Sequence, residues 1–370
     1  KTIKEGTFDG CSSLKSITIP DSVTHISDEG AFDGCSGLET IEVGKGNTVY
    51  HSAGNCLIKT DSKTLVLGCK SSVIPSDGSV TSIGDSAFSG CSSLESIIIP
   101  DSVTSIGYYA FRDCTSLTSI TIPDSVTNIY RDAFYGTAYY NDQSKWENGV
   151  LYIGRHLVVA KTDIEGAYAV KSGTLNIADF AFSDCSSLES ITIPDSVTSI
   201  GDIVFEGCYS LKSITIPDGV TSIGYYAFEG CSSLESITIP DSITSIGYSA
   251  FSNCTSLESI TLPNSITSIG NGVFYNCYSL KSITLPDSVT SIGDGAFNGC
   301  NELEEIEVGK GNTVYHIAGN CLIETATKKL LRGSNNSIIP SCGSVTSIAA
   351  YAFSGCGGLK NIEIPDTVTE

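Results

Sequence analysis

The sequence predicts a β-rich solenoid, in which one short coil is repeated and stacked many times. Three observations predict it. Phenylalanine recurs every 23 residues, an apolar-polar alternation follows each recurrence, and a Pro-Asp-Ser turn signal follows the alternation. The period is clearest in two runs of phenylalanines, namely Phe88, Phe111 and Phe134, and then Phe182, Phe205, Phe228, Phe251, Phe274 and Phe297. Such self-similarity at a fixed short period is typical of solenoids.

One coil, residues 231–253, illustrates the repeat. Its Leu234, Ile237 and Ile239 follow the spacing L-x-x-I-x-I, which predicts a strand with one apolar face. Pro240 ends the strand, because proline fixes φ and the Asp that follows favours a turn. A second extended stretch follows at 243–246, and the segment 248–251 is expected to form one helical or 3₁₀ turn. A single coil buries too little to stand alone, so neighbouring coils must stack.

Three interruptions of the period predict irregular coils that carry inserts, near residues 41–75, 137–174 and 306–340. The first and third are near copies, since both contain IEVGKGNTVYH and GNCLI. Apolar stretches around a polar tip, 56–59 and 64–67 in the first insert and 149–153 and 156–160 in the middle one, predict β-hairpins. We expect residues 1–370 to form one solenoid, with both ends of the chain falling inside a repeat.

Composition and charge exclude several classes of function. The net charge is −21, whereas nucleic-acid binding needs a Lys/Arg surface that displaces counterions from phosphates. No apolar run approaches the roughly 18 to 20 residues that cross a bilayer, so no direct membrane insertion is expected. The four histidines are scattered and no Gly-rich phosphate loop follows a strand, so neither catalysis nor a cofactor is predicted.

The recurring string L-x-S-I-T-I-P-D-S-V-T-S-I-G-x-x-A-F-x-x-C resembles the 23-residue repeats of the BspA-like leucine-rich-repeat family, over nearly the whole chain. This resemblance implies a leucine-rich-repeat solenoid of the α/β repeat class, a right-handed superhelix with a parallel sheet. It also implies display outside the cell by bacteria and some protists, with binding to host or neighbouring-cell proteins in certain members. The sequence departs from the family pattern at Thr137, where the Cys column would continue, which suggests a local change in coil geometry.

Cysteines and aspartates recur with the period. Eleven of the 15 cysteines lie three residues after a repeat phenylalanine, from Cys11 to Cys356. A column of small buried thiols explains them better than disulfides, and no C-x-x-C pair predicts zinc or redox chemistry. The aspartates after proline would bind cations if stacking brought them into one row. We expect each of them instead to stabilise the turn of its own coil, and no metal site is predicted. These aspartates include Asp101, Asp124, Asp195, Asp218, Asp241 and Asp287.

The candidate ligand-binding residues lie in the middle insert. The strand face repeats small polar groups, whereas hot spots for protein binding favour Trp, Tyr and Arg. These types gather in the insert as Tyr139, Tyr140, Trp146, Tyr152, Arg155 and His156. The alternative interpretation is that they merely seal an irregular coil.

Two functions remain open from the sequence. One is a non-enzymatic, extracellular or cell-surface protein that binds a protein ligand on host matrix or neighbouring cells. The other is a passive stalk that holds another domain away from the cell. The near-identical coils favour the stalk, and the inserts favour binding. We expect a monomer in either case.

Overall fold

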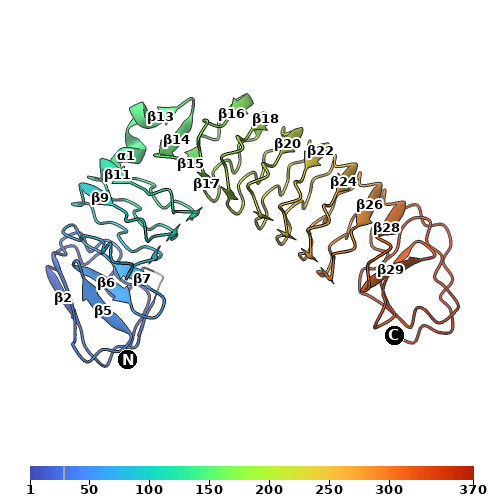
Figure 1. Cartoon of the computed structure of the whole chain (residues 1–370), viewed down its shortest axis with the longest axis horizontal. Helices are drawn as coiled ribbons and strands as arrows, with labels where there is room; N and C mark the ends of the chain where they lie inside the picture. The colour runs from blue at the N-terminus through green and yellow to red at the C-terminus, as the bar shows by residue number, and fades with distance from the viewer. Residues whose placement is uncertain (28–29) are drawn as a thin grey trace. The chain divides into compact units, whose positions relative to one another are not determined.

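A computed structural model describes residues 1–27 and 30–370 of the chain. The chain divides into two compact units, the first formed by Lys1–Val159 with Leu175–Asp179 and the second by Ala160–Thr174 with Phe180–Glu370. Both units are stacks of short coils whose strands run in parallel ladders, which confirms the predicted solenoid (Figure 1).

In the first unit each regular coil contributes a first strand, which lies within the L-x-x-I-x-I pattern, and a shorter second strand. The first strands are β2 Ser16–Ile19, β4 Thr40–Val43, β9 Ser96–Ile98 and β11 Ser119–Thr121. The second strands are β1 Thr2–Ile3, β3 His25–Ile26, β8 Ser82–Ile83, β10 Ser105–Ile106, β12 Asn128–Ile129 and β17 Asn176–Ile177. The inserts add β5 Tyr50–Ala53, β6 Cys56–Lys59, β7 Thr64–Leu67, β13 Trp146–Glu147, β14 Val150–Ile153 and β15 His156–Ala160.

The second unit repeats the same plan. Its first strands are β16 Glu165–Ala169, β18 Ser187–Thr192, β20 Ser213–Thr215, β22 Ser236–Thr238, β24 Ser259–Thr261, β26 Ser282–Leu285 and β28 Glu305–Val308. Its second strands are β19 Ser199–Ile200, β21 Ser222–Ile223, β23 Ser245–Ile246, β25 Ser268–Ile269, β27 Ser291–Ile292 and β32 Ser347–Ile348. The insert contributes β29 Tyr315–Ala318, β30 Cys321–Glu324 and β31 Lys329–Arg332.

The register of the ladders equals the sequence period. Ser213 pairs with Ser236 and Ile214 with Ile237, so each residue lies beside its counterpart one repeat away. Identical side chains therefore form columns. The phenylalanines stack almost parallel, as in Phe251, whose ring centroid lies 5.3 Å from that of Phe228 and 5.8 Å from that of Phe274. These rings and the strand Leu and Ile side chains form the core.

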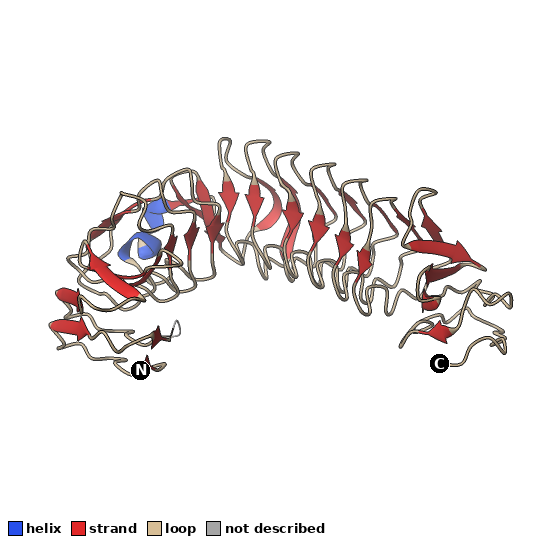
Figure 2. Ribbon diagram, turned by 60° about the horizontal axis from the view of Figure 1, so that its bottom comes forward, coloured by secondary structure: helices blue, strands red, loops and turns tan. Residues whose placement is uncertain are grey.

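The predicted helical turn after the repeat glycine differs in the structure. Bonds such as Ala250 N–H to the Gly247 carbonyl and Ser252 N–H to the Ser249 carbonyl close single turns, but Ser249 has φ 50°, which no right-handed helix allows. The segment also bonds between coils, since the Phe228 amide donates to the Ala250 carbonyl at 2.8 Å. Within the described residues, helix is confined to α1 Ala138–Asn141 and η1 Gln143–Lys145, blue in Figure 2.

In both inserts for which a hairpin was predicted, the two expected segments form neighbouring strands. In the first insert β6 pairs antiparallel with β7, and β5 adds a third strand. The third insert repeats this arrangement with β29, β30 and β31, as expected of near copies. In the middle insert β14 and β15 lie side by side in one sheet, and β13 pairs antiparallel with β14.

The cysteine column is a packing feature, as predicted. All fifteen cysteines, each of which the structure describes, are free; Cys11 and Cys342 are exposed and Cys356 is half-buried, while the others are buried. From Cys208 to Cys300 each thiol of the column bonds a main-chain carbonyl, as when Cys254 Sγ donates to the Phe228 carbonyl at 3.2 Å. Burial raises the pKa of Cys91 and Cys185 to about 12, so these thiols stay protonated.

Candidate binding site in the middle insert

The middle insert begins where threonine replaces cysteine. Thr137 is buried in the place of the cysteine, its hydroxyl donates to the Phe134 carbonyl at 2.9 Å, and its oxygen accepts from the Tyr140 amide at 3.0 Å. The second bond makes Thr137 the N-cap of α1. A thiol caps a helix poorly, so this substitution turns the chain out of the regular coil, in line with the local change expected there.

The segment after α1 positions Trp146. Asp142 caps η1 by accepting from the Ser144 amide at 2.9 Å, and η1 ends at Lys145, directly before Trp146, the first residue of β13. The turn between β13 and β14 consists of Asn148 (φ 50°) and Gly149 (φ 82°), both in the left-handed region that a tight two-residue hairpin turn requires. These local signals fix the place of Trp146.

Three of the predicted residues are half-buried, and two of them, Tyr140 and Trp146, are in contact. The Tyr140 and Trp146 rings lie 5.3 Å apart, edge to face, and Trp146 Nε1 donates to the Tyr140 carbonyl at 2.8 Å. Tyr139 faces the hairpin, where its hydroxyl donates to the Tyr152 carbonyl at 3.1 Å, and Lys145 lies 5.4 Å from the centre of its ring. Burial, together with Tyr135 and Asp132, raises the pKa of the Tyr140 hydroxyl, which is therefore neutral.

Of the other three predicted residues, two contact the preceding coil and the third, Tyr152, is buried. Tyr152 and His156 are buried, and His156 Nε2 lies 3.1 Å from the Pro123 carbonyl. Burial lowers the pKa of His156, so its ring is neutral at pH 7. Arg155 is exposed but its guanidinium pairs with Asp124 at 2.7 Å. The contacts of His156 and Arg155 hold the hairpin on the preceding coil, whereas Tyr140 and Trp146 are only half-buried.

Sequence reasoning missed two side chains that extend this group. Tyr135, 44% exposed, has its ring 5.2 Å from that of Tyr140, and the Arg112 guanidinium lies 5.5 Å from the Tyr135 ring centre. Arg112 and Tyr135 each follow a repeat phenylalanine in successive coils, so the 23-residue register alone could have placed them side by side. We call Arg112, Tyr135, Tyr140 and Trp146 the aromatic cluster.

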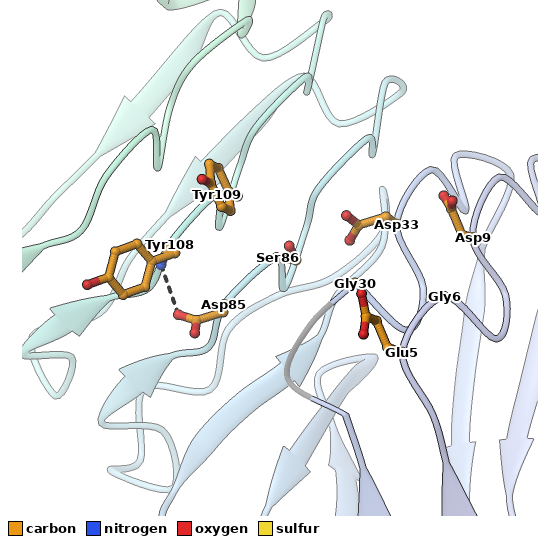
Figure 3. Close-up of a pocket in the computed structure, with 9 residues that line it drawn as sticks. All are labelled: Glu5, Gly6, Asp9, Gly30, Asp33, Asp85, Ser86, Tyr108 and Tyr109. Atoms are coloured by element: carbon orange, nitrogen blue, oxygen red, sulfur yellow. Dashed lines mark hydrogen bonds between the residues drawn. The ribbon is translucent and has the colours of Figure 1, made fainter.

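A separate hollow of about 630 Å³ lies elsewhere in the first unit (Figure 3). It is lined by Glu5, Asp9, Asp33 and Asp85, with the Asp85 carboxylate accepting from the Tyr108 amide at 2.9 Å. Burial raises the pKa of Asp33. In the described part of the chain no three His, Cys, Asp or Glu side chains are grouped closely enough to hold a metal ion.

The six aspartates considered as a possible cation-binding row are all exposed, and contacts between coils come instead from the serines that follow most of them. Ser125, for example, donates to the Val103 carbonyl at 2.8 Å. Two of these aspartates have a defined partner, since Asp124 pairs with Arg155 and Asp287 accepts from the Gly311 amide at 2.9 Å.

The repeats match a known protein family. The family model described as the BspA type leucine rich repeat region (6 copies) matches residues 1–64, 66–174, 175–304, 221–343 and 331–370. The chain belongs to the BspA-type leucine-rich-repeat family. None of the curated proteins matches it. In this family the repeats form the scaffold, and leucine-rich-repeat proteins commonly bind other proteins.

Solved structures of other leucine-rich-repeat proteins are similar to this member of the BspA-type family. A leucine rich cell surface protein from Faecalibacterium prausnitzii is 27% identical, with 83% of each chain covered and a TM-score of 0.36. A leucine-rich repeat protein from Bacteroides ovatus is 28% identical, with 84% of this chain and 82% of that chain covered and a TM-score of 0.39. Among the described residues no helix has the length and apolar character needed to cross a bilayer.

Proposed function

We propose that this protein is a non-enzymatic repeat scaffold of the cell surface that binds a protein partner through the aromatic cluster. The proposal rests on a continuous row of contacts at the surface. The Arg112 guanidinium lies over the Tyr135 ring, the Tyr135 ring lies beside that of Tyr140, and the Tyr140 ring packs against Trp146. Trp, Tyr and Arg are the residue types that dominate the binding energy of protein interfaces.

The cluster is also held rigidly, which favours binding. The Thr137 cap, the Asp142 cap and the two-residue turn of the hairpin fix the backbone on both sides of the rings. A rigid surface loses little conformational entropy when a partner docks, so more of the contact energy appears as affinity. Because the Trp146 Nε1 group already bonds the Tyr140 carbonyl, the tryptophan offers its apolar ring rather than a hydrogen bond.

Charge narrows the class of partner. The chain carries a net charge of −21, and an acidic protein attracts partners with basic surfaces. Adhesion to a protein of host matrix or of a neighbouring cell fits both this charge and the family, and it requires an extracellular position. We infer that the protein acts there as a monomer and without a cofactor.

The test compares matched alanine variants. The double variant Tyr135→Ala/Trp146→Ala removes two rings of the cluster, and Tyr209→Ala, which removes a ring 54% exposed on a regular coil, serves as control. Binding to a panel of immobilised matrix proteins and whole cells is measured by biolayer interferometry and flow cytometry. We expect saturable binding that the double variant weakens at least about tenfold and the control leaves unchanged. Equal binding by all three proteins would disprove the site.

A passive stalk is the second candidate function, and the regularity of the coils favours it. Ser213, Ser236, Ser259 and Ser282 occupy one column of the strand face, so much of this surface has no feature that distinguishes one coil from the next. A stalk would show no saturable binding to any member of the panel, before or after the substitutions.

A further inference from the structure

A hollow of about 470 Å³ lies in the second unit. It is lined mainly by the turn segments that come directly after the repeat glycine in successive coils. The floor of the hollow is one column of equivalent positions, each two residues after the repeat glycine of its coil or after the alanine that replaces this glycine. In this column Ser249, Gly272 and Gly295 lie between Tyr226 and Tyr351. All five residues have φ between 50° and 63°. The backbone therefore continues unchanged, and the hollow arises because three successive coils replace a large side chain with a small one.

Tyrosine rings surround this floor. Tyr248 and Tyr275 are 42% and 44% exposed and belong to the columns on the two sides of the floor, while Tyr351 at one end is 70% exposed. At the other end the Tyr226 and Tyr248 rings lie 5.0 Å apart, edge to face. Four aromatic side chains thus face one concave surface, which we call the tyrosine groove.

The polar groups of the groove are mostly neutral. Ser252 and the asparagines Asn253, Asn271 and Asn298 supply hydroxyl and amide groups that can both donate and accept hydrogen bonds. Glu229 and Asp294 add two carboxylates, and the lining contains neither lysine nor arginine. Several of these groups are already ordered, since Asn271 Oδ1 accepts from the Asp294 amide at 2.9 Å and Asn253 Nδ2 donates to Ser252 Oγ at 3.1 Å.

We propose that the tyrosine groove binds a neutral glycan chain. The C–H groups on the face of a sugar ring carry partial positive charge and pack on the negative face of an aromatic ring. Sugar hydroxyls pair with side chains that donate and accept, which the asparagines and Ser252 do. A volume of about 470 Å³ lies in the range of small-ligand sites.

The repeat itself suits a polymer of sugars. Neighbouring coils are separated by roughly 4.8 Å, and one sugar unit of an extended glycan advances its chain by a similar length. Successive coils therefore offer comparable groups to successive sugars. The two carboxylates and the net charge of −21 repel an anionic polysaccharide, so the ligand is neutral. This site is independent of the aromatic cluster, which belongs to the first unit.

The experiment uses the whole chain and four variants. Tyr248→Ala removes a wall of the groove, and Tyr248→Phe keeps the ring. Gly272→Tyr fills the floor, and the same column tolerates tyrosine with positive φ at Tyr226 and Tyr351. Tyr278→Ala is the control, since its ring is 43% exposed and lies outside the groove. Circular dichroism verifies that each variant is folded.

Binding is measured first on an array of neutral and acidic oligosaccharides and then by calorimetry with the best hexasaccharide, beside an oligolysine peptide. We expect a neutral glycan to bind, Tyr248→Ala and Gly272→Tyr to weaken it at least about tenfold, and Tyr248→Phe and Tyr278→Ala to change it less than about twofold. Absence of binding to every sugar, preference for acidic sugars or for oligolysine, or unchanged binding by Gly272→Tyr would each overturn the proposal.

Discussion

Replacing Phe251 with alanine should destabilise the second unit strongly, because this ring lies in the middle of the phenylalanine stack. Phe251 has no exposed surface, and its ring is nearly parallel to those of Phe228 and Phe274, with interplanar angles of 4° and 6°. A Phe to Ala change in a packed core costs about 3 to 5 kcal/mol. The loss of two ring contacts, each about 0.5 to 1.5 kcal/mol, puts Phe251→Ala toward the upper end of that range.

The matched control is Phe8→Ala in the first unit. Phe8 is only partly buried and stacks on one ring, that of Phe32, at 5.1 Å. The same change of side chain should therefore cost clearly less than at Phe251. Urea unfolding followed by circular dichroism gives the free energies, and hydrogen exchange shows where the structure opens.

Because coils interact mainly with their nearest neighbours, the damage from Phe251→Ala should spread outward from its own coil. The Phe228 amide, which donates to the Ala250 carbonyl, should exchange its proton faster than amides several coils away. A loss of stability below about 1 kcal/mol, or a cost equal to that of Phe8→Ala, would refute the claim that the stacked rings hold neighbouring coils together.

Three further predictions follow from single contacts. Gly247→Ala should destabilise the fold by about 1 to 3 kcal/mol, because an added Cβ would lie 2.8 Å from the Gly224 carbonyl carbon. Urea unfolding measures this loss, and a variant as stable as the wild-type protein would contradict the prediction. Hydrogen bonds with Ser344 lower the pKa of the exposed Cys342 thiol, so iodoacetamide at pH 8 should modify Cys342 in the folded protein and leave Cys254 intact, as judged by peptide mass spectrometry. Since burial lowers the pKa of His156, the unfolded chain binds more protons below pH 6.5; the melting temperature should fall from pH 7.5 to pH 5, and less steeply in His156→Gln.

The repeat made most of the fold predictable. Leu234, Ile237 and Ile239 alternate with polar residues, and that pattern alone orients the strand, because only one face can be buried. The turn at Ser249 was not predictable from its own sequence, because its backbone bonds link neighbouring coils and its positive φ follows from them. Long-range contacts of this kind override local propensity.

Only part of the candidate site could be predicted, because some of its residues are placed by local signals and others by contacts between coils. Trp146 and Tyr140 have strong local signals, namely the Thr137 cap and the hairpin turn. The burial of His156 depends on the Pro123 carbonyl 33 residues away, and no local pattern distinguishes a buried histidine from an exposed one. Arg112 was missed because its partner Tyr135 belongs to the next coil, although the period relates the two positions.

The most direct test of the proposed function is photo-crosslinking from the aromatic cluster. A photoreactive phenylalanine analogue replaces Tyr135 in one protein and Tyr278, whose exposure is almost equal, in another. Both are irradiated on the cells or matrix protein that the wild-type chain binds. The proposal predicts a crosslinked partner from position 135 and none from position 278. Equal crosslinking from both positions, or crosslinking from position 278 alone, would contradict it.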